Sequence, residues 1–407
     1  MAKIDDSVKK KVPELRFPGF TDDWEERKLK DIAQFNPKTV LPDEFEYVDL
    51  ESVVGTEMIS HRTESKDQAP SRAQRLAQKG DVFYQTVRPY QMNNYLYDLP
   101  YDNYVFSTGY AQMRPNIDSY FLLNSVQNKQ FVQHVLDRST GTSYPAINSS
   151  DLSNIEIHVP SKLSEQQKIG AFFQSIDDTI ALHQRKLDLL KEQKKGYLQK
   201  MFPKNGAKVP ELRFAGFADD WEERKLGEFS DVRDGTHASP KYVSQGHPMV
   251  TSKNLTHSGL DMTDVSFLTD EDFNEINKRS KVSIGDILFG MIGTIGNPVI
   301  VDRDDFAIKN VALIKEKTSN PITNKWLLQY LKSPSFNRFI QKENAGGTQK
   351  FIALGLIRDM KLRVPEFDEQ QKIGAFFKKI DDTIALHQRK LDLLKEQKKG
   401  FLQKMFV

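Results

Sequence analysis

The side chains of this 407-residue sequence that are best suited to chemistry are amide, hydroxyl and basic groups in short, turn-rich stretches. In the first half of the chain, one stretch directly follows the strand-like Val82-Phe83-Tyr84, and another is rich in serine and threonine. Such groups pair with the edges of DNA bases, because Arg and Lys identify guanine while Asn and Gln identify adenine. The candidate base-reading residues are Gln85, Thr86, Arg88, Tyr90, Gln91, Asn93, Asn94, Thr142, Ser143 and Tyr144.

The second half offers a comparable set of polar residues in unrelated surroundings. Its candidates are Thr236, His237, Lys241, Lys253, Asn254, Thr294, Asn297, Lys309, Asn310, Thr348, Gln349 and Lys350. The alternative for each residue of both sets is an ordinary surface loop. Bulk charge does not decide between them, since 58 Lys and Arg residues face 56 Asp and Glu residues, for a net charge of +2. Any DNA binding must therefore come from local patches.

Motifs for catalysis and cofactor binding are missing from the sequence. It has no Walker A motif, no G-x-G-x-x-G after a strand, no H-E-x-x-H and no G-x-S-x-G. It also has no cysteine, which excludes disulfides, thiolate zinc sites and cysteine nucleophiles. His237, His247 and His257 lie in turn-rich sequence and do not favour a metal site. We therefore expect no catalytic residue, no metal and no cofactor in this chain.

The targeting class also follows from the sequence. The first 20 residues contain no apolar core of signal-peptide length, and no run of 18 apolar residues occurs anywhere. The sequence therefore predicts a cytoplasmic protein without membrane contact.

The elements that must position the candidate residues are built twice. Residues 11–29 and 208–226 differ at two positions, and residues 165–202 and 369–406 differ at three. Between these repeats lie two segments that share only a faint skeleton, including Gly80-Asp81 and Gly285-Asp286. Two modules on a common scaffold with different surfaces predict the same task performed on two targets. A recent duplication with one drifting copy is the alternative.

The longer repeats predict helices. From Ile169 to Met201 apolar residues alternate spacings of four and three, which is a heptad seam, and the second copy repeats it. One amphipathic helix cannot bury such a seam alone, so we expect the two to pack on each other. The short link between helix one and module two favours an antiparallel pair, with the modules related by a pseudo-twofold axis and the arm 11–29 at the end of helix two. His183 and Lys194, with His387 and Lys398 as their equivalents, interrupt the seam. They would either contact a partner or set the register, or these positions are simply solvated.

The repeated aromatic residues of the arms and helix starts are the candidates for binding a protein partner. Two nearly identical surfaces predict two equivalent partner subunits on one chain. The residues are Phe17, Phe20, Trp24, Phe172, Phe214, Phe217, Trp221 and Phe376. The alternative is that these aromatics pin each arm onto the helices.

The duplicated P-E-L-R-F-x-G-F-x-D-D-W-E arms and E-Q-Q-K-I-G-A-F-F helices, together with two divergent modules, resemble the specificity subunit of type I restriction–modification systems. The resemblance covers essentially the whole chain. It implies an α+β (mixed) fold with two globular target recognition domains, separated by two long helices that form an antiparallel coiled coil. The expected segments are an arm at 1–29, target recognition domain 1 at 30–160, a helix at 161–203, an arm at 204–226, target recognition domain 2 at 227–365 and a helix at 366–407.

The resemblance also implies a function. Each module would read one half of a bipartite, asymmetric site in double-stranded DNA, and the helices would set the spacing and dock two methyltransferase subunits. The chain itself would be non-catalytic. S-adenosylmethionine would belong to the methyltransferase subunits, and two restriction subunits would supply ATP- and magnesium-dependent cleavage. The alternative from another class is a coiled-coil scaffold whose two modules bind proteins or glycans.

Overall fold

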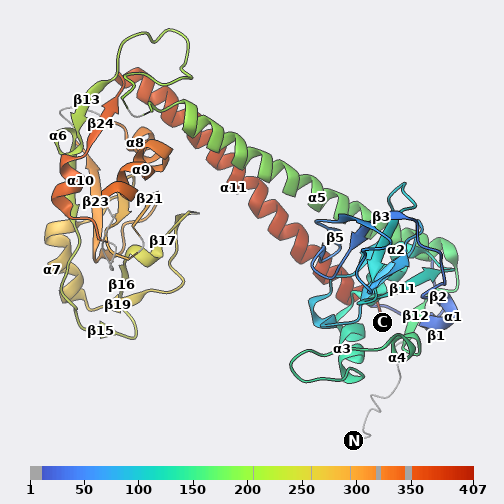
Figure 1. The fold of residues 1–407 in the computed structure, drawn as a ribbon. Coiled ribbons are helices and arrows are strands. Elements are labelled where there is room, and N and C mark those ends of the chain that lie inside the picture. The colour runs from blue at the N-terminus through green and yellow to red at the C-terminus, as the bar shows by residue number, and fades with distance from the viewer. Residues whose placement is uncertain (1–11, 205, 258, 294, 318–321, 344–350) are drawn as a thin grey trace, which may run out of the picture. The chain divides into compact units, whose positions relative to one another are not determined.

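The computed structural model describes residues 12–204, 206–257, 259–293, 295–317, 322–343 and 351–407. The chain divides into two compact units (Figure 1). Unit 1 contains the residues up to Gln184 together with Arg389–Val407, and unit 2 is Arg185–Gln388. The two long helices, α5 (Leu163–Lys200) and α11 (Phe367–Lys404), each contribute one half to each unit. Each unit is therefore completed by a helix segment from the other half of the sequence.

Unit 1 contains two four-stranded sheets. The first has the order β2-β11-β8-β9 with antiparallel neighbours, and the second has the order β6-β3-β10-β7 with β3 and β10 parallel. The strands are β2 (Ala33–Phe35), β3 (Glu44–Val48), β6 (Arg62–Ser65), β7 (Ala73–Leu76), β8 (Val82–Gln85), β9 (Tyr95–Leu96), β10 (Tyr104–Ser107) and β11 (Tyr110–Pro115). Short helices and two small ribbons complete the unit: α1 (Leu29–Ile32), α2 (Ser119–Val126), α3 (Lys129–Asp137), α4 (Ser149–Ser153), β1 (Glu25–Lys28) paired with β12 (Glu156–Val159), and β4 (Val53–Val54) paired with β5 (Glu57–Met58).

Unit 2 repeats the first of these sheets and changes the second. The order β14-β23-β20-β21 matches β2-β11-β8-β9, whereas β15-β19-β16-β22 has its parallel pair at one edge. The strands are β14 (Ser230–Asp234), β15 (Tyr242–Val243), β16 (His247–Val250), β19 (Ser266–Leu268), β20 (Ile287–Gly290), β21 (Gly296–Ile300), β22 (Ala307–Ile308) and β23 (Val311–Glu316). The remaining elements are β13 (Glu222–Lys225) paired with β24 (Lys361–Val364), β17 (Leu255–Thr256) paired with β18 (Gly259–Leu260), α6 (Leu226–Phe229), α7 (Asp270–Ser280), α8 (Asn324–Lys332), α9 (Pro334–Glu343) and α10 (Leu354–Asp359).

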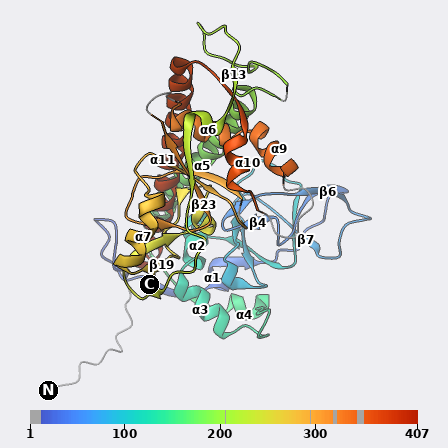
Figure 2. The ribbon, with the colours of Figure 1, turned by 90° about the vertical axis from the view of Figure 1, so that its left-hand side faces the viewer.

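The arrangement inside unit 2 is clear from two directions. In both views β13 lies at one end of the unit, and β19 lies with α7 at the other (Figures 1 and 2). The arm-side elements and the second sheet thus occupy separate ends of the unit.

An inner strand of the repeated sheet, β8 in unit 1 and β20 in unit 2, explains why the two modules share Gly80-Asp81 and Gly285-Asp286. All four residues of β8 and of β20 are buried, as a continuous apolar run predicts. Gly80 and Gly285 enter these strands at φ of 95° and 94°, a region that favours glycine. The next residue closes the turn, since the Asp81 carboxylate accepts a hydrogen bond from the Gln78 backbone N–H at 2.8 Å and the Asp286 carboxylate accepts one from Ser283 at 2.7 Å.

The helices pair in antiparallel fashion within each unit. In unit 1 the Phe172 and Phe401 rings lie 4.9 Å apart and Asp177 pairs with Lys398 at 2.6 Å, so residue numbers rise along α5 as they fall along α11. Unit 2 repeats both contacts through Tyr197 with Phe376 and Lys194 with Asp381. The antiparallel prediction is confirmed. The two seam lysines are cross-helix ion pairs, not solvated interruptions.

A buried carboxylate at each helix start holds the arm in place, and we call this group the arm clamp. Glu165 is 1% exposed and accepts two hydrogen bonds from the Arg16 guanidinium, at 2.6 and 2.8 Å, and one from the Trp24 indole N–H at 3.4 Å. Unit 2 has the same group: Arg213 donates to Glu369 at 2.7 and 2.8 Å, and Trp221 donates at 3.1 Å.

Each arm also reaches the end of the other long helix. The Leu15 backbone N–H donates to the Lys404 carbonyl at 2.8 Å, and Leu212 donates to Lys200 at 2.9 Å. Trp24 packs edge-on against Phe406, with ring centroids 6.4 Å apart. The prediction that the first arm lies at the end of helix two is confirmed.

The structure corrects the assignment of the arm tryptophans to a partner. The tryptophans Trp24 and Trp221 are 3% and 1% exposed, so a partner cannot reach them. The phenylalanines are engaged inside their own unit, because Phe17 packs on Phe172 and Phe214 on Phe376, each at 5.8 Å, while Lys168 and Lys372 lie over Phe20 and Phe217 at 5.0 and 4.6 Å. The pinning alternative therefore describes the two tryptophans, whereas the six phenylalanines are only half-buried and their assignment to a partner stays a prediction.

Other residues at the start of each long helix contact a helix of the adjacent module, α2 in unit 1 and α8 in unit 2. Gln166 accepts a hydrogen bond from the Asp118 N–H at 3.2 Å and donates to the Pro160 carbonyl at 2.9 Å, and Gln370 bonds Thr323 and Pro365 in the same way. A Cβ on Gly170 would clash with the Asp118 carboxylate, and one on Gly374 would lie 3.0 Å from the Lys325 Cβ. These two glycines permit the close approach of a module helix. Among the residues that the structure describes, no helix is both long and apolar enough to span a bilayer.

We expect Glu369→Ala to destabilise the start of α11 and the second arm by about 2–3 kcal/mol, because Arg213 would keep a half-buried charge without its partner. Native-state hydrogen exchange at the amides of 212–221 and 367–377 measures this change. The matched control is Glu192→Ala, which removes an exposed pair to Lys195 and should cost within about 0.5 kcal/mol. Equal effects of the two variants would contradict the clamp.

Candidate nucleic-acid interface

The candidate residues of unit 1 meet at one edge of its first sheet. Strands β2 and β8 both run antiparallel to β11, so their C-terminal ends point toward the start of β11, with Gln85 opposite Tyr110 and Phe35 opposite Met113. We call this the recognition edge. The stretch after β8 is bound there to the stretch after α3 by the bridge between Val87 and Ala146 and by a 2.8 Å hydrogen bond from the Arg88 N–H to the Pro145 carbonyl. The structure therefore brings together the two stretches that the sequence singled out.

Strained backbone shapes the tip of this edge. Arg88 and Met92 have φ of 55° and 56° and flank a single 3-10 turn, Pro89–Gln91. A left-handed conformation costs a non-glycine residue about 1–2 kcal/mol, and such strain concentrates at functional sites. Here it turns Tyr90 outward, with 49% of its surface exposed.

The same turn places the Arg88 guanidinium over the ring of Tyr144, 5.4 Å from its centroid. Tyr144 is 68% exposed, so the pair stands at the surface. The buried Arg88 Nε has no acceptor among the described residues, so the guanidinium keeps unused donors. An arginine positioned over an exposed aromatic ring can offer the donor fork that binds the O6 and N7 of guanine.

Three of the predicted base-reading residues of unit 1 are buried and hold the loop from inside. Gln85, Thr86 and Asn94 are 2%, 7% and 1% exposed. Gln85 donates to the Val87 carbonyl at 2.7 Å, Thr86 donates to the Gly109 carbonyl at 2.8 Å, and Asn94 accepts from the Gln85 N–H at 2.8 Å. The prediction that these side chains face DNA is wrong, because the loop needs their hydrogen bonds. The surface of the loop consists of Arg88, Tyr90, Gln91, Asn93, Thr142, Ser143 and Tyr144.

Unit 2 gathers four candidates at the corresponding edge, where β14 ends and β23 begins. Thr236 forms a bridge with Lys309, whose ammonium donates to Ser239 at 3.1 Å. His237 places Nδ1 2.7 Å from the Asn310 amide oxygen and Nε2 2.9 Å from the Asp234 carboxylate. Because an acceptor oxygen lies beside each ring nitrogen, both nitrogens must carry a proton to form these bonds. This favours the charged imidazolium form. The pKa of His237 is accordingly raised, first by the bond to Asn310 and then by the bond to Asp234.

The other candidates of unit 2 lie apart from this cluster. Asn254 is 2% exposed and bonds its own turn at Thr251, Asp261 and Asp264, so its assignment to DNA is wrong for the same reason as that of Gln85. Lys253 pairs with Asp264 at 2.9 Å, and Asn297 donates to the Leu255 carbonyl at 3.1 Å. Lys241 is exposed between β14 and β15. Thr294, Thr348, Gln349 and Lys350 lie outside the described residues.

The sequence did not reveal the residues that position these groups. Asp234 also pairs with Arg279, 45 residues away, and Asn36 bonds Ser149 and the Gln112 N–H from a left-handed backbone at φ of 46°. Only Asn36 carried a local signal, the Asn36-Pro37 turn dipeptide. Contacts between residues that lie far apart in the sequence, such as Asp234 with Arg279, leave no signal in the local sequence.

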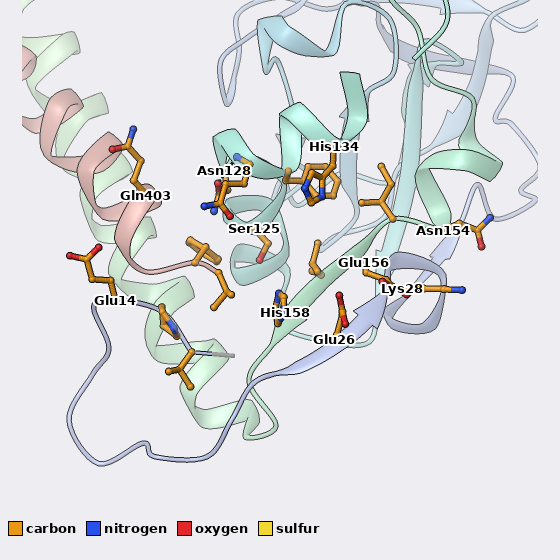
Figure 3. Close-up of a pocket in the computed structure, with 18 of the residues that line it drawn as sticks. Glu14, Glu26, Lys28, Ser125, Asn128, His134, Asn154, Glu156, His158 and Gln403 are labelled. Carbon is orange, nitrogen blue, oxygen red and sulfur yellow. Dashed lines mark hydrogen bonds between the residues drawn. The ribbon is translucent and has the colours of Figure 1, made fainter. Parts of the chain in front are cut away.

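A cavity of about 710 Å³ in unit 1 is not part of this interface. Figure 3 shows it between Glu14 and Gln403 on one side and Glu26, Glu156 and His158 on the other. Three glutamates and the cations Lys28 and Arg138 nearly balance its charge. None of the candidate base-reading residues lines it, and the described part of the chain holds no group of three potential metal ligands.

Comparisons with known proteins agree on one family. The family model described as "Type I restriction modification DNA specificity domain" matches residues 21–192 and again residues 218–396. The MjaVIII type I restriction enzyme specificity subunit of Methanocaldococcus jannaschii is 24% identical over 297 residues, which cover 70% of this chain and 69% of that one. The HindI specificity subunit of Haemophilus influenzae is 26% identical over 176 residues, covering 40% and 37%.

Solved structures share the fold. The type I restriction–modification S subunit from M. genitalium is 17% identical with a TM-score of 0.66, covering 97% of this chain and 99% of that one. A chain from a study of assembly and conformational transition of the type I R-M system is 22% identical with a TM-score of 0.54 and covers 97% and 99%.

We expect His237 to titrate above its ordinary pKa of 6.5 in an NMR pH titration. The stabilisation that the imidazolium gives to the loop is complete below the ordinary pKa and is lost as the pH rises through the raised one. Asn310→Ala should lower the pKa because it removes an acceptor, and Asp234→Asn should lower it because it removes the negative charge beside the ring. A midpoint at or below 6.5, or one that Asn310→Ala leaves unchanged, would refute the assignment.

Proposed function

Since the chain belongs to the type I restriction modification DNA specificity family, we propose that each of its two units reads one half of a bipartite, asymmetric DNA sequence. The observation that carries the proposal is a repeated sheet with different chemistry at its recognition edge. Unit 1 presents the Arg88–Tyr144 pair there, and unit 2 presents His237, Lys309 and Asn310. One scaffold with two sets of exposed donors suits two different half-sites.

The two edges suit different contacts. In unit 1 the guanidinium of Arg88 is the base reader, and the exposed hydroxyls of Thr142 and Ser143 are positioned for phosphates or bases. In unit 2 the imidazolium of His237 and the ammonium of Lys309 favour the phosphate backbone. The cations of the unit 2 edge therefore add affinity beside its candidate base reader Asn310, whose amide suits adenine, whereas the unit 1 edge discriminates through Arg88.

The chain acts without chemistry of its own in this proposal. Two methyltransferase subunits would bring S-adenosylmethionine, and two restriction subunits would use ATP and magnesium, in the cytoplasm where the chromosome lies. The names of the relatives, which are restriction enzyme specificity subunits, support this division of labour.

The repeated surface that remains exposed is the better candidate for docking the methyltransferase subunits. It is an exposed face on the first half of each long helix, which reaches to Leu182 in α5 and Leu386 in α11, both 65% exposed. Around them lie Ala171, Asp178 and Thr179 in unit 1 and Ala375, Asp382 and Thr383 in unit 2. In the proposal of two equivalent subunits on one chain, these residues replace the buried Trp24 and Trp221.

Exchanging residues 30–160 for the corresponding segment of another family member should change one half of the methylated sequence and leave the other half intact. Each recognition edge is built within its own unit, which is why the effect should be confined. Methylome sequencing of cells that express the chimera with its partner subunits measures the outcome. A reciprocal exchange of 227–365 should change the other half, and a change of both halves by either exchange would refute independent reading.

We expect Arg88→Ala to relax discrimination at one base pair of one half-site by about 1–3 kcal/mol, roughly 10- to 100-fold, because a bidentate guanine contact would be lost. Competition binding with single-substituted duplexes measures it. Arg27→Ala is the matched control, since Arg27 is an exposed arginine of unit 1 that pairs with Glu25 on β1. A uniform loss over all sequences would assign Arg88 to the phosphate backbone instead.

A further inference from the structure

A second groove, of about 760 Å³, lies wholly within unit 2. Its walls are the last turns of α5, the α8–α9 pair and the start of β21, and its rim includes Asn297 and His257. Asn297 follows the loop between β20 and β21, at the end of β20 where the recognition edge lies. The groove therefore begins at the edge that presents the candidate base readers of unit 2.

The groove has a large excess of positive charge. The lysines and arginine of its lining come from three helices, and among the residues that the structure describes Asp381 is the one carboxylate that lines it. The cations are Lys191, Lys194, Lys195, Lys332 and Arg338. Asp381 is already paired with Lys194 at 2.6 Å, so it cannot neutralise the others.

Lys332 is the clearest sign of a missing anion. Its side chain is half-buried, and among the described residues it has no hydrogen-bond acceptor. Burial, and then the charge of Lys194, lower the pKa of Lys332 to about 8, while Asp381 acts in the opposite direction. Burying an ammonium without a partner is unfavourable, so the site favours an incoming negative charge.

The excess charge is not a property of the repeated scaffold. The helix caps Asp118 and Thr323 correspond to each other, and the same offset aligns Lys332 with Gln127 and Arg338 with Gln133. The lysines of α5 do recur in α11 as Lys395, Lys398 and Lys399. Unit 2 therefore adds two cations at positions where unit 1 has neutral amides.

We propose that this groove binds the phosphodiester backbone of DNA next to the half-site that unit 2 reads, an inference that rests on the proposed function. Cations spread over α5, α8 and α9 suit several phosphates of one strand better than a single small anion. Continuity with the recognition edge places this backbone beside the bases being read. The groove thus supplies sequence-independent affinity on one side of the site only.

The first test measures the affinity of the complex of this chain with its methyltransferase partners for a duplex that carries its methylated sequence, over a range of salt concentrations. The double variant Lys191→Glu, Lys195→Glu should weaken binding at least tenfold and reduce the salt slope by about two. The matched control is Lys395→Glu, Lys399→Glu, which changes the equivalent lysines of unit 1 and should stay within about threefold. Equal losses in both variants, or no loss in the first, would overturn the proposal.

The second test uses the titration of Lys332. A phosphate favours the charged ammonium, so binding should take up a proton and weaken as the pH rises from 7 to 9. Lys194, Asp381 and Arg338 face this group from the neighbouring helices and are unchanged in the variants. Lys332→Arg should keep the affinity and lose its pH dependence, whereas Lys332→Gln should lose both. A wild-type affinity that does not vary over this range would count against the site.

A third experiment distinguishes DNA from free phosphate as the bound anion. A comparison of duplexes then separates a failure of the groove from a failure of the proposed function. Acetylation of lysines with mass-spectrometric readout should show Lys332 and Lys191 protected by the duplex, but not by inorganic phosphate at the same phosphate concentration. Equal protection by phosphate would make this a free-anion site and refute a DNA groove. If the wild-type complex does not prefer its own duplex over a scrambled one, the proposed function fails; if it does but the variants match it, only the groove fails.

Discussion

The whole chain depends on two buried carboxylates, Glu165 and Glu369. Each is almost without solvent contact, and a carboxylate there is tolerable only when it is paired and hydrogen-bonded. The arginine and tryptophan that satisfy it come from an arm more than 140 residues away in the sequence. Because the same arm also bonds the end of the other long helix, one charged group joins an arm, a helix start and a helix end. This explains why arms and helix starts vary so little between the two copies.

Fixing the scaffold in this way leaves the recognition edge free to differ. The clamp and the helix seam use the arms and the long helices. The exposed donors instead lie on loops at the opposite end of the sheet from the starts of β2 and β14, where β1 and β13 connect. Loops on a rigid sheet can change their side chains without unpairing a buried group of the scaffold. The second sheets, whose strand orders differ between the units, show how far this freedom extends.

Sequence periodicity predicted the helices closely but not the roles of their residues. The repeats 165–202 and 369–406 became Leu163–Lys200 and Phe367–Lys404, since a heptad seam is a local pattern. The arm aromatics were assigned to a partner because amphipathicity does not say which apolar surface covers them. Gln85 and Asn94 look like base readers until the fold shows their bonds to the loop itself. The groove cations Lys191 and Lys332 lie 141 residues apart, and nothing local announces their meeting.

The attachment of the modules sets a physical limit on how they can be exchanged. Gln166 and Gln370 each accept a hydrogen bond from the backbone N–H at the cap of a module helix, α2 and α8 respectively, and Gly170 and Gly374 let that helix approach closely. An incoming module must therefore place a helix cap at the same point, although its sequence is otherwise unconstrained. A module in which the helix equivalent to α2 or α8 begins one residue later would leave a glutamine oxygen unsatisfied and would open a gap over the glycine. Since backbone N–H groups make this contact, divergent sequences such as Asp118 and Thr323 both satisfy it, and the two recognition edges can change independently of the scaffold that carries them.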